Sequence, residues 1–437
     1  MCKLAETPQL PYNPSIMTDK KLSTQPYKGV RDFYPEDMAI QRFIFQTWSK
    51  TAERFGFERY DASILEPSDL YKAKGAENEE LINEQTYTFI DRGGREVTLR
   101  PEMTPTVARM VAGKKRDLAF PLRWYSIPNL FRYERPQRGR LREHWQLNCD
   151  LFGSDEVASD IEIIALANQV LLDFGATPEM FTILINDRRE MTAAYNSLGI
   201  TDTETIDKIT RLTDRKRKIS RNDYEAGLQD ILHDNDLTRK VIDLIEDTNG
   251  TNPVIEGLQK LGVENVKLDR TIARGFDYYT GTVFEITDNH PDNNRALLGG
   301  GRYDNLTAMF GGEAISGVGF GMGDVTMRDF LETHNLIPEH IRTTAPTIVA
   351  IPVSSEQNLY AEKVALQIRR AGHKVATALG DKKVGKKIAV ADKQGSRFII
   401  VIGEDEVETE TLTVKNLLTG EEHTGSLGEL MNLFKIE

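Results

Sequence analysis

The chain has 437 residues, too many for one ordinary domain, so two or three domains are expected. Apolar residues make up 39% and charged residues 28%, a composition that supports buried cores and argues against wholesale disorder. The two cysteines form no CxxC motif and no HExxH is present, so neither a disulfide framework nor a structural zinc site is supported. No stretch approaches the roughly 20 apolar residues of a membrane span, and we expect a cytoplasmic protein.

Charge is distributed unevenly along the chain. The formal net charge of −12 argues against a protein that coats nucleic acid indiscriminately. Between Lys363 and Arg397, however, ten Lys/Arg stand against two Asp/Glu, a local balance of +8. Further basic clusters lie at 211–221 and 132–142. One such run is most often a solvated helix face, but three in an acidic chain indicate local contacts with phosphate.

The first half of the chain is predicted to be a tail, a helix and a strand-rich segment. Residues 1–26 are polar and form a loose N-terminal tail. A helix is predicted from Pro35 to Phe55, because a proline and two acids suit its first turn and apolar residues then recur at helical spacing. Residues 58–152 are mostly strand-like.

The second half begins with a charged helical region at about 187–262, after which strands resume near 282–286. Residues 331–343 are polar and turn-rich and are predicted to be a linker. From residue 344 to 437 apolar strands alternate with helices, which predicts a separate domain with a small, mostly parallel sheet.

One polar strand is the first candidate for a binding site. The segment 131–150 alternates, with Trp145, Leu147 and Cys149 on one face and Gln146, Asn148 and Asp150 on the other. A line of polar side chains in an apolar neighbourhood indicates the floor of a pocket, although a water-facing sheet surface is the simpler reading of a single strand. Glycine-rich segments at 317–323 and 380–387 match neither a dinucleotide-binding fingerprint nor a complete P-loop.

Several segments resemble one enzyme family. Phe131-Arg132-x-Glu134, followed by a basic loop and the polar strand, resembles motif 2 of class II aminoacyl-tRNA synthetases. Four further segments resemble the histidyl members of that class: their signature peptide, their amino-acid strand, their glycine-rich wall and the approach to their motif 1 dimer helix, which correspond here to 274–285, 98–104, 299–304 and 28–35. The resemblance extends from residue 27 to the C-terminus.

The resemblance implies an α+β fold. An antiparallel sheet flanked by helices is expected over 27–330, with the helical insertion at 187–262, and an anticodon-binding α/β domain over 344–437. It also implies activation of L-histidine by ATP to histidyl-adenylate and transfer to the 3′ end of tRNA(His), releasing pyrophosphate and AMP. A homodimer formed through the Pro35–Phe55 region is expected as well.

The same resemblance implies roles for residues that would hold histidine. Glu102, Thr104 and Gln146 would bind the α-ammonium group. Asp150 would accept a hydrogen bond from the imidazole, with Tyr279 as its partner. The remaining two side chains, which would build the wall of the pocket, are Tyr278 and Tyr303.

ATP would be bound through Arg132, Glu134 and Arg274. Arg132 would grip the α-phosphate, and Arg274 would stabilise charge from the opposite side as the carboxylate attacks phosphorus. ATP implies Mg²⁺, for which Glu285 and Asp304 are the conceivable ligands. This kind of catalysis rests on positioning and electrostatics and needs little from a protein base.

One motif departs from the family pattern. The glycine-rich motif 3 usually continues into an arginine that contacts the γ-phosphate, but Thr326 stands at that position. Arg328 comes two residues later, a rotation of about 200° on a helix, and should face away. Arg135, Arg140 or Arg142 of the basic loop could take its place.

Two other functions are compatible with parts of the chain. A non-catalytic paralogue binds histidine as the regulatory subunit of ATP phosphoribosyltransferase and shares the catalytic fold, and the altered motif 3 favours it. Intact Arg132, Arg274 and Glu102, together with the basic C-terminal domain, argue against it. A general RNA-binding protein would leave the polar strand and its tyrosines unexplained.

Overall fold

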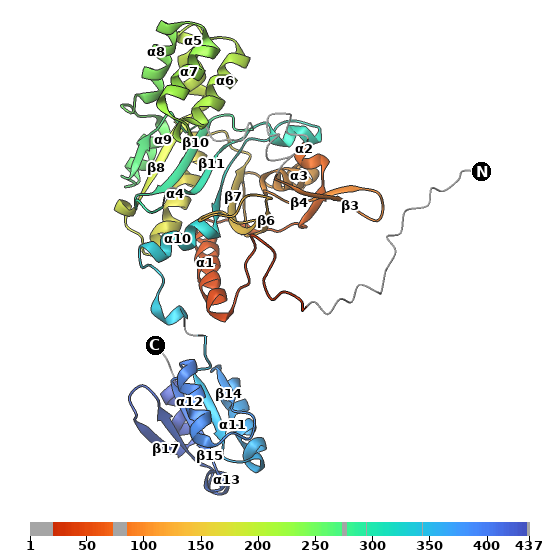
Figure 1. The fold of residues 1–437 in the computed structure, drawn as a ribbon, viewed down its shortest axis with the longest axis vertical. Coiled ribbons are helices and arrows are strands. Elements are labelled where there is room, and N and C mark those ends of the chain that lie inside the picture. Colours follow the sequence, from red (N-terminus) through yellow and green to blue (C-terminus); the bar gives the residue numbers. More distant parts are fainter. Residues whose placement is uncertain (1–20, 73–84, 273–277, 294, 343, 435–437) are drawn as a thin grey trace, which may run out of the picture.

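The computed structural model describes residues 21–72, 85–272, 278–293, 295–342 and 344–434. Figure 1 shows a large body, a helical unit above it and a C-terminal body below it. Among the described residues, no helix is both long and apolar enough to cross a membrane.

The large body is built on a nine-stranded sheet whose order is β1-β5-β7-β12-β11-β10-β8-β9, with β6 paired to β7. Only the outer pairs β1–β5 and β8–β9 are parallel. The strands are β1 Glu58–Arg59, β5 Leu122–Ser126, β6 Asn129–Phe131, β7 Glu143–Phe152, β8 Phe181–Asp187, β9 Val266–Leu268, β10 Thr282–Asp288, β11 Ala296–Arg302 and β12 Gly317–Gly323.

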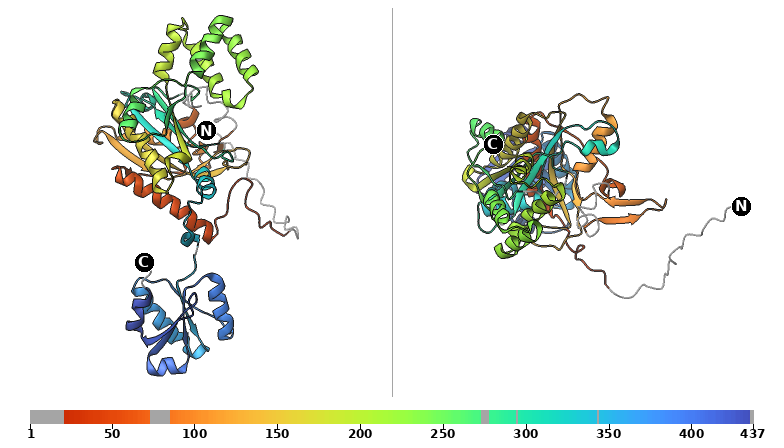
Figure 2. Two further views of the ribbon diagram at one scale, coloured as in Figure 1. Left: turned by 90° about the vertical axis from the view of Figure 1, so that its left-hand side faces the viewer. Right: turned by 90° about the horizontal axis from the view of Figure 1, so that it is seen from above.

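Helices cover one face of this sheet: α1 (Pro35–Arg54), α4 (Val157–Asp173), α9 (Pro253–Lys260) and α10 (Asp324–Thr333). On α1, Ile44, Trp48 and Ala52 are fully buried at a spacing of four residues, so one stripe of the helix meets the sheet. The main hydrophobic core therefore lies between these helices and the sheet (Figure 2). A separate hydrophobic cluster contains Met103, Val107, Phe152 and Val283.

A small sheet of order β2-β4-β3 lies beside the large one and comprises β2 (Leu65–Pro67), β3 (Tyr87–Ile90) and β4 (Glu96–Leu99). The strand-like reading of 58–152 was wrong for α3 (Thr104–Lys114). Pro105 occupies its first turn, and Val107, Ala108 and Val111 bury one helical face. The short helix α2 (Asp69–Lys72) was also missed.

The helical unit contains α5 (Arg188–Ser197), α6 (Thr203–Asp214), α7 (Arg221–Leu232) and α8 (Asn235–Glu246), which surround a hydrophobic core of their own. Side chains that accept backbone N–H groups cap the start of each helix, namely Asp187, Asp202, Ser220 and Asp234. The next helix, α9, packs against α4 and so belongs to the large body.

The C-terminal body holds a five-stranded sheet of order β14-β13-β15-β16-β17. Strands β14, β13 and β15 are parallel to one another, as the alternation of strands and helices predicts. Strands β15, β16 and β17 pair in antiparallel fashion. The elements are β13 Ile348–Pro352, α11 Asn358–Arg370, β14 Val375–Thr377, α12 Val384–Gln394, β15 Phe398–Ile402, α13 Glu404–Thr409, β16 Thr411–Asn416, β17 Glu422–Ser426 and α14 Leu427–Leu430.

Candidate active site

The floor of the candidate site is the polar face of β7. Leu147 and Cys149 point into the main core, and Asp150 belongs to the opposite face with Gln146 and Asn148. The neighbouring strand β12 places Gly319 opposite Asp150 and Gly321 opposite Asn148. A Cβ on Gly321 would come within 2.6 Å of the Gln146 side chain. Glycines on β12 therefore keep this part of the sheet clear for a ligand.

A cavity of about 560 Å³ extends over this floor. It is lined by the segment that follows β6, by the loop before β7, and by the ends of β10, β11 and β12. The cavity is lined by Arg132 and Glu134, which the resemblance assigns to ATP, and by Gln146, which it assigns to the α-ammonium group of histidine. The pairing of β6 with β7 ends at Phe131, so Arg132 and Glu134 follow the strand and are not part of it.

The helical unit also reaches this cavity. Asp214 at the end of α6 and Arg217 just beyond it line the wall next to Glu285. Arg217 Nη2 lies 2.5 Å from Asp269 Oδ2, and its Nη1 lies 3.5 Å from Glu285 Oε1. Sequence reasoning saw the basic cluster 211–221 but assigned it no place in the site, because only the fold brings this segment to β10.

A second group of side chains, called the tyrosine compartment here, contains three tyrosines that pack in one hydrophobic cluster. The ring centroids of Tyr278 and Tyr279 are 4.9 Å apart, and those of Tyr278 and Tyr303 are 5.9 Å apart. Tyr278 donates to Glu102 Oε2 at 3.3 Å. Burial raises the pKa of the Tyr278 phenol well above its usual range, with a further rise from Glu102, while the Thr104 hydroxyl acts in the opposite direction. Glu102, Thr104 and Tyr278 thus meet at one end of the compartment.

Asp150 lies at the other end, where Tyr303 donates a hydrogen bond to its Oδ1. The resemblance had assigned the imidazole contact to Asp150 with Tyr279, whereas the phenol that reaches Asp150 in the structure is that of Tyr303. Burial raises the pKa of Asp150 to about 7, against the opposing effect of the Tyr303 hydrogen bond. Its second oxygen, Oδ2, is buried with no hydrogen-bond partner in the described part of the chain.

Sequence reasoning missed two hydroxyls near this end of the tyrosine compartment: Tyr60 interacts with Asp150, and Ser126 lies beside Tyr60 and opposite Asn148 in the sheet. Tyr60 Oη and Ser126 Oγ are buried; Ser126 acts on Tyr60 as a hydrogen-bond partner, but neither oxygen has a hydrogen bond of normal geometry in the described part of the chain. Burial and then the Asp150 carboxylate raise the pKa of Tyr60 well above its usual range, and Ser126 opposes this rise. Each unsatisfied buried group costs about 1–3 kcal/mol, so such a cluster is typical of a site completed by a ligand.

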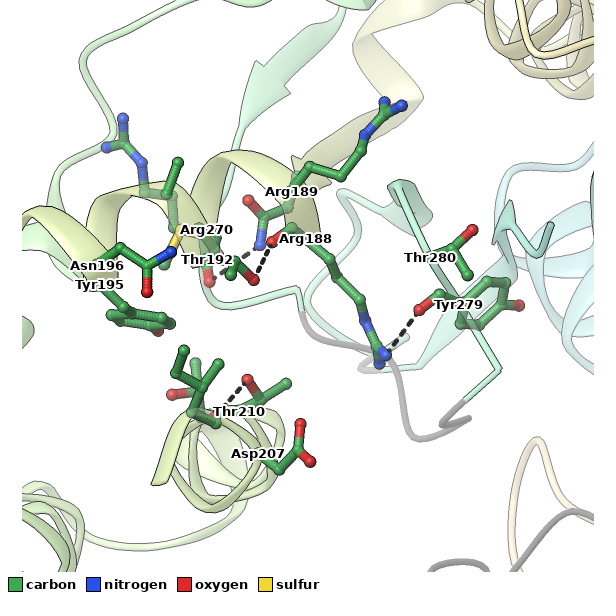
Figure 3. Close-up of a pocket in the computed structure, with 15 residues that line it drawn as sticks. Arg188, Arg189, Thr192, Tyr195, Asn196, Asp207, Thr210, Arg270, Tyr279 and Thr280 are labelled. Atoms are coloured by element: carbon green, nitrogen blue, oxygen red, sulfur yellow. Dashed lines mark hydrogen bonds between the residues drawn. The ribbon is translucent and has the colours of Figure 1, made fainter. Parts of the chain in front are cut away.

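Figure 3 shows a second cavity, of about 530 Å³, between the helical unit and the tyrosine segment. Arg188 at the start of α5 points across it, and its Nη1 donates to the Tyr279 carbonyl at 3.0 Å. Arg270 also borders the cavity and pairs with Asp247 at 2.9 Å. The helical unit therefore holds the backbone of the tyrosine wall in place.

The structure shows where the residues of the altered motif 3 lie. Asp324, the first residue of α10, is fully buried and accepts hydrogen bonds from Trp145 N at 2.9 Å and Gln41 at 3.0 Å. Arg328 pairs with Asp37 of α1 at 2.9 Å, so it faces α1, as the helical rotation predicts. Thr326 lines the cavity with a short side chain.

Of the loop arginines expected to replace the motif 3 cation, only Arg140 lines the cavity, and it pairs with Glu134 at 2.6 Å. Arg142 is buried with its guanidinium 4.0 Å from the Tyr133 ring, and Arg135 is exposed. Arg274 lies outside the described residues. The other expected site residues fall into two adjoining groups, one in the cavity and one in the tyrosine compartment.

Comparison with known proteins places the chain in a family. A family model described as histidyl-tRNA synthetase matches residues 29–324, and one described as an anticodon-binding domain matches 347–437. A histidine–tRNA ligase of Leptospira biflexa is 40% identical, covering 96% of this chain and 99% of the relative. A histidine–tRNA ligase of Thermoplasma volcanium is 38% identical, covering 92% and 96% respectively.

A crystal structure of histidyl-tRNA synthetase from Nostoc sp. PCC 7120 superposes with a TM-score of 0.78 at 25% identity, covering 95% of this chain and 99% of that one. The predicted α+β class, with its antiparallel catalytic sheet and C-terminal α/β domain, is confirmed. The chain belongs to the histidyl-tRNA synthetase family.

Proposed function

We propose that this protein activates L-histidine with ATP and esterifies it to the 3′ end of tRNA(His). The observation that carries the proposal is that the tyrosine compartment and the cavity share strand β7, the first through Asp150 and the second through Gln146. One ends at a buried carboxylate with an unpartnered oxygen, and the other is lined by arginines. A ring with N–H donors fits the first compartment, and a polyphosphate fits the second.

Histidine is held at both ends in this proposal. Glu102 and Thr104, together with Gln146 on β7, bind the α-ammonium group. The hydrogen bond from Tyr278 holds the Glu102 carboxylate next to the tyrosines. The imidazole N–H donates to Asp150 Oδ2, which has no other described partner. An analogue without a ring N–H leaves this carboxylate unpaired and is rejected for that reason.

Activation joins the two compartments. A carboxylate oxygen of histidine attacks the α-phosphorus of ATP, the new O–P bond forms, and pyrophosphate leaves with the electron pair of the broken bond. Arg132 stabilises the charge on the α-phosphate, since its Nε is fixed by the Pro101 carbonyl at 2.8 Å and it makes no ion pair with a described residue. Arg274 is proposed to act from the opposite side. The tRNA 3′-terminal hydroxyl then attacks the acyl carbon, loses its proton and displaces AMP.

Mg²⁺ is proposed to enter with ATP. In the described part of the chain, no three His, Cys, Asp or Glu side chains cluster as metal ligands. With nucleotides, Mg²⁺ keeps phosphate oxygens and water as most of its ligands and takes one or two carboxylates from the protein. Glu285 lines the cavity and fits that role. Asp304 accepts hydrogen bonds from Thr280 at 2.7 Å and Ser316 at 2.6 Å, which suits a structural role.

The C-terminal body, over residues 344–437, is proposed to bind the tRNA anticodon. Lys382, Lys383 and Lys386 are exposed around the start of α12, whereas Lys387 is buried and donates to the Pro352 carbonyl at 2.9 Å. Replacing the exposed lysines with glutamine should weaken tRNA charging and its salt dependence but leave histidine activation unchanged. Equal losses in both steps would contradict this assignment.

A homodimer in the cytoplasm is proposed as the working form. Tyr34 and Met38 at the start of α1 and Phe89 and Ile90 on β3 are exposed large apolar side chains. Light scattering on a size-exclusion column tests the dimer. The altered motif 3 leaves the histidine-binding regulatory paralogue as a second candidate, but that paralogue lacks the anticodon domain matched here at 347–437.

The deciding experiment is ATP–pyrophosphate exchange with each amino acid in turn. Exchange with histidine alone, lost in Arg132→Ala, is expected. Folded protein that binds histidine but exchanges no pyrophosphate would refute the ligase and support the regulatory paralogue.

A further inference from the structure

The cavity holds more positive charge than its own acids neutralise. Its described lining includes the arginines Arg132, Arg140, Arg217 and Arg295 and the acids Glu134, Asp214 and Glu285. Arg140 pairs with Glu134 at 2.6 Å, and Arg217 pairs with two acids at 2.5 and 3.5 Å. Among the described residues, Arg132 and Arg295 make no ion pair. The proposed function already uses Arg132, which leaves Arg295 to be explained.

Arg295 directly precedes β11 and bridges to the loop before β7. Its Nε donates to the Arg138 carbonyl at 3.1 Å, so the guanidinium is anchored to the loop on one side. A Cβ placed on Gly139 would meet Arg295 Cδ at 2.7 Å and Thr326 Cγ2 at 3.5 Å. The stem of Arg295 and the short side chain of Thr326 therefore lie at the same point of the wall. A long side chain at 326 would compete with Arg295 for this space.

The surroundings of Arg295 destabilise its charge. Partial burial lowers the pKa of its guanidinium, Arg140 lowers it further, and Glu134 opposes them. Glu134 is already paired with Arg140. A guanidinium keeps its proton in proteins, so a bound anion would add to the partial compensation that Glu134 gives. The planar fork of an arginine suits two oxygens of a phosphate group.

We propose that Arg295 binds the β- and γ-phosphates of ATP and then the departing pyrophosphate. This inference rests on the proposed function, in which Arg132 is assigned to the α-phosphate. The side chain that binds the pyrophosphate leaving group then comes from the residue before β11. Helix α10 does not supply it, because Thr326 carries no charge and Arg328 pairs with Asp37.

The test compares ligands that contain the β- and γ-phosphates with one that lacks them. We expect Arg295→Ala to raise KM for ATP and for pyrophosphate at least about 10-fold in exchange assays, the effect of one lost charged hydrogen bond. KM for histidine and Kd for a non-hydrolysable histidyl-adenylate analogue should stay within about twofold, because neither ligand contains those phosphates. Arg328→Ala is the matched control and should leave KM for ATP unchanged.

A second variant separates a phosphate contact from a structural effect. Arg295→Ala combined with Thr326→Arg should recover most of the ATP affinity, because both side chains start from the same wall. Unchanged KM for ATP and pyrophosphate in Arg295→Ala would overturn the inference, as would an equal loss of adenylate-analogue binding. Wild-type protein without exchange would refute the proposed function instead. Calorimetric ATP binding to wild type and Arg295→Ala would then still decide the role of Arg295.

Discussion

Asp150 is predicted to favour histidine binding and to lower the stability of the free protein. Its side chain is buried, Oδ1 accepts from Tyr303, and Oδ2 has no described hydrogen-bond partner. The informative change is Asp150→Asn, which keeps the size of the side chain and an acceptor for Tyr303 but removes the charge.

The sign of the stability effect follows from the raised pKa. Burial moves the pKa of Asp150 from 3.8 to about 7, so between these values the folded chain holds a proton that the unfolded chain has released. Stability therefore falls as the pH rises through this window. At about 1.36 kcal/mol per pH unit, the difference sets an upper limit of about 4 kcal/mol above pH 7. Without histidine, Asp150→Asn should melt at a higher temperature than wild type at pH 8, with a smaller difference at pH 5.

The effect on histidine has the opposite sign. The variant loses a charged acceptor worth about 1.5–3 kcal/mol, so KM for histidine should rise roughly 10- to 150-fold while KM for ATP stays unchanged. Calorimetric melting at both pH values and pyrophosphate exchange measure the two effects. Asp155→Asn, an exposed carboxylate just beyond β7, is the control. A lower melting temperature at pH 8 together with an unchanged KM for histidine would refute the reasoning.

Three further changes test the site and its support. Gly319→Ala should abolish exchange, because a Cβ would come within 2.6 Å of the Cys149 carbonyl and displace β7. Gly323→Ala should remain active, because its Cβ has a nearest contact of 3.5 Å. Tyr60→Phe should raise KM for histidine about fivefold by removing a buried hydroxyl, with no change for ATP; no change for either substrate would exclude the hydroxyl from the site. Asp160→Ala removes the 2.6 Å partner of the buried Arg302 and leaves it only the longer ion pair with Asp304 at 3.4 Å, so urea unfolding should show a loss of about 3–5 kcal/mol. A loss below about 1 kcal/mol would contradict this.

Local patterns in the sequence predicted the parts of the site that depend on one element. The alternation on β7 separates Asp150 from Cys149 because successive side chains of a strand point to opposite faces. The turn of a helix places Arg328 away from the cavity for an equally local reason. Helix α3 was missed because the strand-like reading of its surroundings outweighed the helical spacing of its buried residues.

Tertiary structure decided which distant segments complete the site. Tyr60 comes close to both Ser126 and Asp150 only because β1 pairs with β5 and β5 with β7. Arg217 reaches the cavity because the helical unit folds against β10. Arg295 and Thr326 both lie beside Gly139 because β11 pairs with β12. Sequence by itself determined the family, the fold class and the polar face of β7, since these are carried by short motifs and periodicity. The balance of charge in the cavity and the unsatisfied groups near Asp150 depend on distances between strands that are far apart in the sequence. Only the folded chain sets these distances.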